Sequence, residues 1–270
     1  MSETIPIFPK VGNILVQSGN IVNWNRLKRK PNNTSTEEIC ECVSVCLSNY
    51  LKRADRNQLQ YATELVCENK EFIESLPAEK RDDLKITVKV VLYNRESPEV
   101  LIDAVDKALS DLGVSFVETV LLAIPDTENE ITVEDIKPFW TVLQTLVEQE
   151  KVFFLGICDL DKARFEQLFD WATVKPCIDQ VNLASCCVMP EDLRDFAKLH
   201  NVQLLTHNDP PDVLPLQSLQ DAIRKSSTSK DGDNWEPSWI SRYSTIVKCR
   251  GIILTKGYVI NLTRDIKRKS

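Results

Sequence analysis

The chain has 270 residues, of which 43% are hydrophobic, enough material for one large domain, and α/β barrels commonly reach this length as single domains. A net charge of −7 argues against a nucleic-acid or anionic-membrane partner, because both need a basic surface. The sequence contains no run of about 18 apolar residues, and its first 30 residues lack signal-peptide features. We therefore expect nine free thiols in a reducing compartment and a cytoplasmic location.

The first 33 residues predict an N-terminal β-hairpin and arm. Residues 13–17 and 21–24 are β-rich runs on either side of a Ser-Gly-Asn turn. Capping side chains at residues 34–36 then precede a helix whose apolar positions continue to Tyr50. Residues 61–76 also predict a helix, so no second strand is placed between the hairpin and residue 86.

From residue 86 onwards, strands alternate with helices. Residues 86–92 form an apolar run interrupted only by Thr87 and Lys89, which is typical of a strand buried on both faces. The strands expected after it are residues 120–124, 152–157, 181–184, 202–205 and 252–254. The helices expected between them are residues 98–112, 132–149, 162–172, 191–199, 219–224 (capped by Ser218) and 239–248, with Gly113 ending the first.

This alternation predicts an α/β fold with a parallel sheet. Six or seven βα units favour a (β/α)8 TIM-type barrel over residues 1–270 as a single domain, although the count alone leaves an open doubly wound sheet as an alternative. Residues 226–234 are polar and predict a flexible loop.

Residues just past the carboxyl ends of barrel strands are the ones expected to be functional. This rim carries Cys158, His207 and the adjacent pair Cys186 and Cys187. We considered zinc binding, with Asp159 or Asp209 as a further ligand, and a thiol nucleophile assisted by His207. Both interpretations give way to the simpler one that these thiols are small core residues, so we predict no metal site.

Lys89 bears most directly on function. A lysine within a strand buried on both faces points into the barrel interior, where its charge is costly unless it is paired. Such a lysine is either a proton-relay group or a relic supported by a neighbouring carboxylate. The alternative is a shifted strand whose lysine reaches solvent.

Several motifs resemble the aldo-keto reductases. Residues 155–160 (LGICDL) resemble their Gly-Val-Ser-Asn-Phe motif, and residues 180–183 (QVNL) resemble their Gln-Val-Glu-Tyr strand. Residues 250–258 are similar to their last strand with its cofactor lysine, and residues 86–89 to the strand that carries their catalytic lysine. This similarity runs from about residue 84 to 264 and implies an aldo-keto-reductase-like barrel.

A more specific resemblance is to the modifier subunits of glutamate–cysteine ligase. It rests on residues 180–190 (QVNLASCCVMP), 204–210 (LLTHNDP), 19–24 and 243–258. The resemblance implies a cytosolic heterodimer with the ligase catalytic subunit, which makes γ-glutamylcysteine for glutathione synthesis. It also implies that the modifier raises the catalytic subunit's affinity for glutamate and relieves feedback inhibition by glutathione.

Departures from the reductase pattern point to a non-catalytic protein. Active reductases use a tyrosine proton donor assisted by lysine, histidine and aspartate. Lys89 fills the lysine position, but Ala123 stands at the histidine position, and no stretch matches the aspartate and tyrosine. The competing hypotheses are an NADPH-dependent reductase with an unusual donor and an NADPH-binding sensor scaffold.

The resemblance leaves cofactor and partner contacts open. Gln180, His207 and Lys256 match positions that hold NADPH in reductases, whereas the usual Ser-Asn is replaced by a Cys-Asp pair. We expect that no cofactor is required, and residual NADPH binding stays an open alternative. An intersubunit disulfide is a further open hypothesis; its candidate thiols are Cys186, Cys187 and Cys249.

Overall fold

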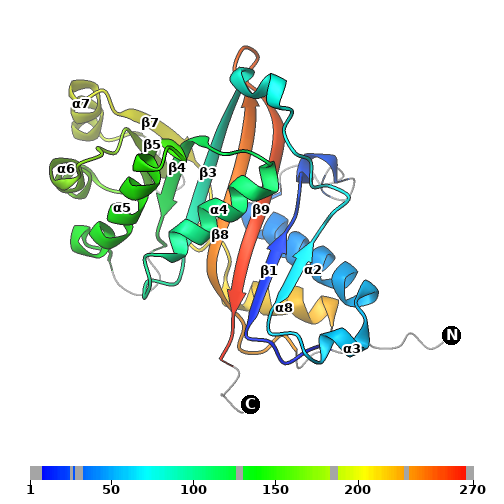
Figure 1. Ribbon diagram of the computed structural model, residues 1–270. Coiled ribbons are helices and arrows are strands. Elements are labelled where there is room, and N and C mark those ends of the chain that lie inside the picture. Colours follow the sequence, from blue (N-terminus) through cyan, green and yellow to red (C-terminus); the bar gives the residue numbers. More distant parts are fainter. Residues whose placement is uncertain are drawn as a thin grey trace.

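A nine-stranded mixed sheet forms the centre of the structure (Figure 1). The computed structural model describes residues 8–24, 27, 33–125, 130–182, 188–227 and 231–265. Its strands are β1 (Asn13–Gln17), β2 (Leu65–Glu68), β3 (Leu84–Leu92), β4 (Val117–Ala123), β5 (Val152–Cys158), β6 (Ile178–Asn182), β7 (Gln203–His207), β8 (Glu236–Val247) and β9 (Ile252–Thr263). They follow the order β2-β1-β9-β8-β3-β4-β5-β6-β7 along the sheet.

Most neighbouring strands run parallel. Strands β3 to β7 are parallel neighbours, and β1 is parallel to β2. Strands β8 and β9 form an antiparallel hairpin inserted between β1 and β3. The α/β class and the parallel βα succession from β3 to β7 are as predicted, whereas the central hairpin was not anticipated.

Helices cover both faces of this sheet (Figure 1). One face packs against α4 (Val100–Leu112), α5 (Val133–Glu148), α6 (Lys162–Trp171) and α7 (Glu191–Leu199). The other face, around β1 and β9, packs against α2 (Ser35–Arg53) and α8 (Leu216–Ser226). The remaining short elements are η1 (Ile21–Asn23), α3 (Arg56–Leu59) and η2 (Ala78–Asp83).

Local sequence explains where several helices begin and end. Thr34 and Glu37 form a capping box at the start of α2, and Thr132 and Asp135 form another at the start of α5. Gly113 ends α4 in the left-handed conformation, with φ of 64°. These three helix boundaries agree with the sequence predictions.

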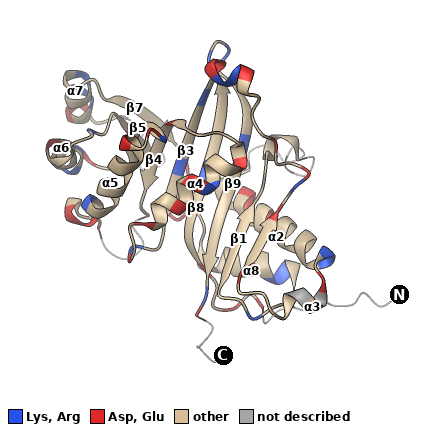
Figure 2. Cartoon of the chain, in the orientation of Figure 1, with Lys and Arg blue, Asp and Glu red and all other residues tan. Residues whose placement is uncertain are grey.

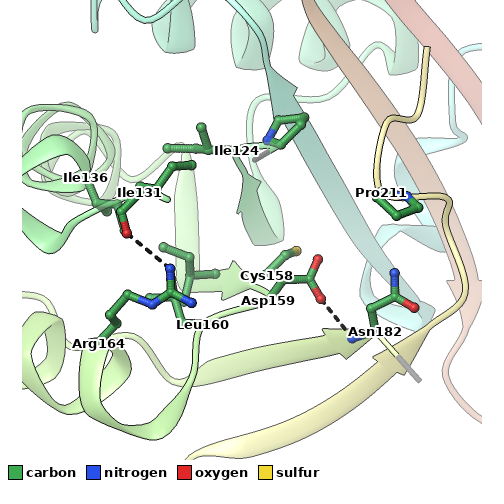
Figure 3. A pocket seen from close by; sticks show the side chains of 11 residues that line it. Ile124, Ile131, Ile136, Cys158, Asp159, Leu160, Arg164, Asn182 and Pro211 are labelled. Carbon is green, nitrogen blue, oxygen red and sulfur yellow. Dashed lines mark hydrogen bonds between the residues drawn. The ribbon is translucent and has the colours of Figure 1, made fainter. Parts of the chain in front are cut away.

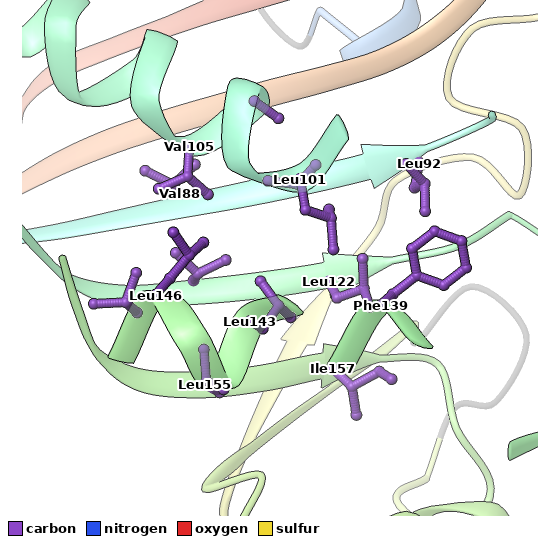
Figure 4. Packing of buried hydrophobic residues seen from close by; sticks show 14 of the residues in the cluster. Val88, Leu92, Leu101, Val105, Leu122, Phe139, Leu143, Leu146, Leu155 and Ile157 are labelled. Carbon is purple, nitrogen blue, oxygen red and sulfur yellow. The ribbon is translucent and has the colours of Figure 1, made fainter. Parts of the chain in front are cut away.

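The larger hydrophobic core lies between α4 and α5 and the strands beneath them. Figure 4 shows Leu101 of α4 and Phe139 of α5 directed towards β3 and β4. Val88 and Leu122 on those strands are fully buried. Strand β3 is thus covered on one face by helices, while Lys89, on its other face, points away from this core.

The second half of the predicted N-terminal hairpin is wrong. Residues 21–23 form a 3-10 turn, in which the Asn20 side chain accepts a hydrogen bond from the Val22 backbone. Strand β1 obtains its ladder partners from distant segments, β2 and β9. Long-range pairing therefore replaced the local pairing that the turn residues suggested.

Two other predicted helices contain strands. Within residues 61–76 lies β2, in which Leu65 and Cys67 are buried on one face. Residues 239–248 belong largely to β8, which is rich in aromatic and β-branched residues. Two of its fully buried positions, Ser241 and Thr245, are polar, so no apolar–polar alternation marked it as a strand. Helix α8 begins at Leu216 after Pro215 and not at a Ser218 cap.

Two further predictions concern the polar loop at residues 226–234 and the absence of a membrane-spanning helix. Of residues 226–234, Ser226 ends α8 and residues 231–234 form a turn, while residues 228–230 lie outside the described residues.

Acidic and basic residues are interspersed over the helices and connections (Figure 2). None of the helices described here combines the length and apolar composition needed to cross a lipid bilayer.

The central hairpin leaves no room for a side chain at Gly257. A Cβ atom there would lie 2.2 Å from the Tyr243 hydroxyl oxygen and 2.5 Å from the Gly19 carbonyl oxygen. We expect Gly257→Ala to lower the free energy of unfolding by about 1–3 kcal/mol, measured by urea denaturation. Gly251→Asn is the matched control, because Gly251 has φ of 62° and open space around it, and asparagine tolerates that backbone. Equal losses for the two variants would contradict the explanation.

Candidate functional site

A single buried carboxylate gathers the polar residues at the carboxyl edge of the sheet. Asp209, which follows β7, is 5% exposed and accepts a hydrogen bond from Lys89 Nζ at 2.9 Å. Its two carboxylate oxygens also bind the Arg242 guanidinium at 2.7 and 3.0 Å. Ser35 Oγ donates to the same carboxylate, and His207 Nδ1 lies 3.2 Å from it. We call these five residues the Asp209 cluster.

Four elements of the fold bring the Asp209 cluster together. Lys89 on β3 is the register partner of Arg242 on β8, so both cations lie side by side in the sheet. Ser35 is the first residue of α2, and Asp209 follows the end of β7. The Asp209 carboxylate therefore links the central hairpin, the parallel strands and helix α2.

The electrostatics keep Asp209 ionised. Burial alone would raise the pKa of Asp209, but hydrogen bonds from His207 and Arg242 and the charges of Arg242 and Lys89 hold it well below its usual range. The Lys89–Asp209 pair is almost fully enclosed, with both side chains 5% exposed. This confirms that Lys89 is buried and paired with a carboxylate.

His207 connects the cluster to Asp159. Its Nε2 atom lies 3.0 Å from both Asp159 carboxylate oxygens, and its Nδ1 lies 3.2 Å from both the backbone nitrogen and the Oδ2 atom of Asp209. Burial lowers the pKa of His207, but its hydrogen bonds to Asp159 and Asp209 outweigh that effect and raise it. The imidazole is held edge-on between two acids, in contact with carboxylates on both sides.

The three positions that match cofactor contacts, Gln180, His207 and Lys256, line one cavity. The cavity has a volume of about 560 Å³ and also borders Arg242 and the start of α2. The sequence identified residues that the fold brings together. Their role towards a ligand remains a prediction.

The described residues that line this cavity offer no unpaired cation for the phosphates of a nicotinamide dinucleotide. Lys256 Nζ donates to Glu38 at 2.6 Å, and the Tyr258 hydroxyl donates to the same carboxylate. Arg242 is neutralised by Asp209. Among the described residues, each cation that lines the cavity has an acidic partner, so the residues present do not fit the cofactor.

A second, more apolar cavity of about 250 Å³ lies beyond β4 and β5 (Figure 3). In this view Asp159 points to Asn182, whose backbone N–H it accepts at 2.8 Å. Arg164 donates to the Ile131 carbonyl oxygen at 3.1 Å. Burial raises the pKa of Cys158 to about 12, so this thiol stays protonated and is no nucleophile at neutral pH.

The other residues singled out from the sequence are three cysteines and Ala123. Cys186 and Cys187 lie outside the described residues. Cys249 is exposed in the turn between β8 and β9, whereas Ala123 is buried at the end of β4. No group of three histidine, cysteine or acidic residues suited to a metal ion occurs in the described part of the chain.

Sequence reasoning missed Arg242 and Ser35. Residues 239–248 predict a helix, so Arg242 is not expected among the residues at the carboxyl ends of the strands. Ser35 was considered only as a helix cap, yet its hydroxyl donates to Asp209. A signal for Arg242 existed in the β-rich composition of its neighbours Trp239 and Tyr243, which indicated a strand.

Asp179 is a further acidic residue that the sequence did not single out. It lies in β6 with 0% exposure, and within the described residues neither carboxyl oxygen has a hydrogen-bond partner. Burial and the nearby charges of Asp159 and Asp161 raise the pKa of Asp179 to about 8. The side chain is therefore mostly neutral at pH 7.

Removing the central carboxylate should be costly. We expect Asp209→Ala to lower the free energy of unfolding by about 3–5 kcal/mol, because Lys89 and Arg242 lose their shared counter-charge. The measurement is chemical denaturation at pH 7. Asp221→Ala is the control, since Asp221 is a half-exposed partner of Arg224 and its loss should cost less than about 1 kcal/mol. A similar small loss for both variants would contradict the central role of Asp209.

Asp179 should make stability fall as pH rises. Its pKa is about 8 in the folded chain and about 3.9 when unfolded, so between these values ionisation favours the unfolded state. Asp179→Asn should be near neutral at pH 4 and stabilising on the order of 2–5 kcal/mol at pH 8. Denaturation at several pH values tests this, and a pH-independent difference would refute the neutral carboxyl.

More than half of the chain matches the sequence profile of a known protein family. The sequence profile of the aldo/keto reductase family matches residues 63–209. Among solved structures, a Bombyx mori aldo-keto reductase in complex with NADP is 16% identical, with a TM-score of 0.42, over 76% of this chain and 63% of that one.

Two curated relatives match almost end to end. The glutamate–cysteine ligase regulatory subunit of Mus musculus is 38% identical over 261 residues, covering 96% of this chain and 95% of the relative. That of Homo sapiens is 39% identical over 252 residues, covering 92% of each. These matches confirm the predicted aldo-keto-reductase-like fold class and both resemblances. The chain belongs to the aldo/keto reductase family and, within it, to the family of glutamate–cysteine ligase regulatory subunits.

Proposed function

We propose that this chain is a non-catalytic regulatory subunit of glutamate–cysteine ligase. In this role it binds the catalytic subunit in a cytosolic heterodimer, raises its affinity for glutamate and relieves inhibition by glutathione. The relatives named as regulatory subunits support the partner. The structural observation that carries the non-catalytic part is that no tyrosine hydroxyl bonds to Lys89 among the described residues.

Carbonyl reduction needs a proton donor held at the developing oxyanion. In reductases the lysine assists a tyrosine hydroxyl, but here Lys89 Nζ is 2.9 Å from Asp209. The hydroxyl groups of Tyr93, Tyr243 and Tyr258 donate to Asp212, Asp111 and Glu38, respectively.

The other parts of the relay support the same conclusion. Tyr61 is 80% exposed, and none of the five tyrosines, all within the described residues, bonds to Lys89. Ala123, at the histidine position, has no group that can move a proton. The reductase tetrad is therefore incomplete in this proposal, and the lysine serves to stabilise the fold.

The proposal requires no nicotinamide cofactor. The engagement of Lys256 by Glu38 and of Arg242 by Asp209 leaves no unpaired cation among the described residues that line the larger cavity. A bound NADPH would have to break at least one of these ion pairs. This cost favours a protein that acts through its surface and not through a cofactor.

Regulation by a bound subunit is a coupling of two binding events. If this chain binds the glutamate-competent conformation of the catalytic subunit more tightly, glutamate and the subunit strengthen each other's binding by the same factor. A coupling of about 1–3 kcal/mol corresponds to a five- to 150-fold change in affinity. The exposed Cys249 is the described thiol available for an intersubunit disulfide.

The decisive experiment measures the glutamate KM of the purified catalytic subunit with and without this chain. We expect a several-fold lower KM and a higher glutathione concentration for half-inhibition when the chain is present. We also expect no carbonyl-dependent oxidation of NADPH by the chain alone, and no effect of NADPH on the KM. An unchanged KM in a mixture shown to contain the complex would refute the regulatory role. Carbonyl turnover abolished by Lys89→Met would establish the competing reductase hypothesis.

A further inference from the structure

The far end of the central hairpin is an apolar surface that the fold leaves uncovered. Ile252, Ile253 and Leu254 are consecutive in β9 and are 55%, 50% and 42% exposed. Successive strand residues face opposite sides, so both faces of the hairpin are apolar here. Together with Arg250 and the exposed Val22, these residues form what we call the hairpin-tip surface. Isolated exposed apolar residues are ordinary, but a contiguous group marks an interaction site.

This surface is exposed because the hairpin extends beyond its neighbour β1. Pairing between β1 and β9 ends at Gln17 and Val259. Beyond that point the Asn20 side chain replaces a strand, accepting the Lys256 backbone N–H and donating to the Leu254 carbonyl oxygen. Figure 1 shows the turn between β8 and β9 at one extreme of the molecule.

The turn adds positive charge to the apolar surface. Lys248 and Arg250 flank the exposed Cys249. Lys248 Nζ lies 3.9 Å from the Glu118 carboxylate, whereas the exposed Arg250 side chain makes no hydrogen bond or ion pair among the described residues. The rest of the chain is acidic, with a net charge of −7. A partner that fits this surface has an apolar centre and an acidic rim.

The first and last described residues lie far from this surface. Phe8 packs against Trp235, and Thr263 pairs with Glu236, so both described ends lie at the open end of the hairpin. Strand β9 covers about 36 Å from Ile252 to Thr263 at 3.3 Å per residue.

A second copy of this chain fits poorly. In a two-fold symmetric contact the same patch supplies both sides, so the unpaired positive charge of Arg250 would face a surface that carries the same charge. Like charges across an interface are costly. The positive turn thus favours a different protein with acidic residues.

We infer that the hairpin-tip surface is the docking site for the ligase catalytic subunit, through an apolar patch with an acidic rim on that subunit. This rests on the proposed function, which names the partner, and adds the surface by which it is bound. The exposed Cys249 lies in the same turn, so an intersubunit disulfide at this position would lie at the edge of this interface.

The test is the Kd for the purified catalytic subunit, measured by biolayer interferometry under reducing conditions. The double variant Ile252→Glu/Leu254→Glu should weaken binding at least tenfold, and Arg250→Glu several-fold. Leu199→Glu is the matched control, because Leu199 is 76% exposed at the end of α7, away from the hairpin. Its Kd should equal that of the unaltered chain. Thermal melting of each free variant shows whether its fold is retained.

The outcomes separate the two proposals. If the unaltered chain does not bind the catalytic subunit, the proposed function fails. If it binds and the folded double variant binds equally well, the docking site is wrong while the function stands. Light scattering supplies a third outcome: a dimer of the unaltered chain that the double variant converts to a monomer would assign the surface to self-association and overturn the inference.

Discussion

The buried Asp209 carboxylate is the interaction on which the arrangement of this structure depends. It lies between Lys89 and Arg242, cations on neighbouring strands that would repel each other without it. Ser35 ties the first turn of α2 to the same group. The cluster thus joins the parallel half of the sheet to the hairpin half. It also gives the buried Lys89 ammonium a counter-charge, which stabilises the folded state.

The hairpin explains how a member of the reductase family can have a different internal organisation. Strands β8 and β9 occupy the middle of the sheet, and Trp239, Tyr243 and Tyr258 fill the space around them. The hydroxyl groups of Tyr243 and Tyr258 donate hydrogen bonds to the carboxylates of Asp111 and Glu38. Groups suited to acid–base chemistry are thereby used to satisfy buried charges and hydrogen bonds.

How far the sequence predicts this structure depends on the range of the interactions involved. Capping boxes and Gly113 act within one helical turn, and the sequence placed these helix boundaries correctly. The parallel strands were predicted because short apolar runs alternate with helical segments along the chain. The hairpin was missed because the buried positions of β8 include the polar residues Ser241 and Thr245, which hides the alternation that marks a strand, and Arg242 was therefore not predicted to lie at the site. The contact between Arg242 and Asp209 joins positions 33 residues apart, and no local pattern encodes it.

The central hairpin carries both Arg242 of the Asp209 cluster and the hairpin-tip surface, and this arrangement has a mechanical consequence. Arg242, fixed by Asp209, and Lys256, fixed by Glu38, anchor β8 and β9 on the side that faces α2. The residues beyond them extend towards the turn as a paired ladder from Tyr243 and Gly257 to Val247 and Ile252. This ladder, which has one register shift between Thr245 and Ile246, connects the ion pairs to its free end, so the apolar residues there need little ordering when a partner binds. Preorganisation of this kind gives the buried ion pairs a functional reason to persist in the proposed regulatory subunit.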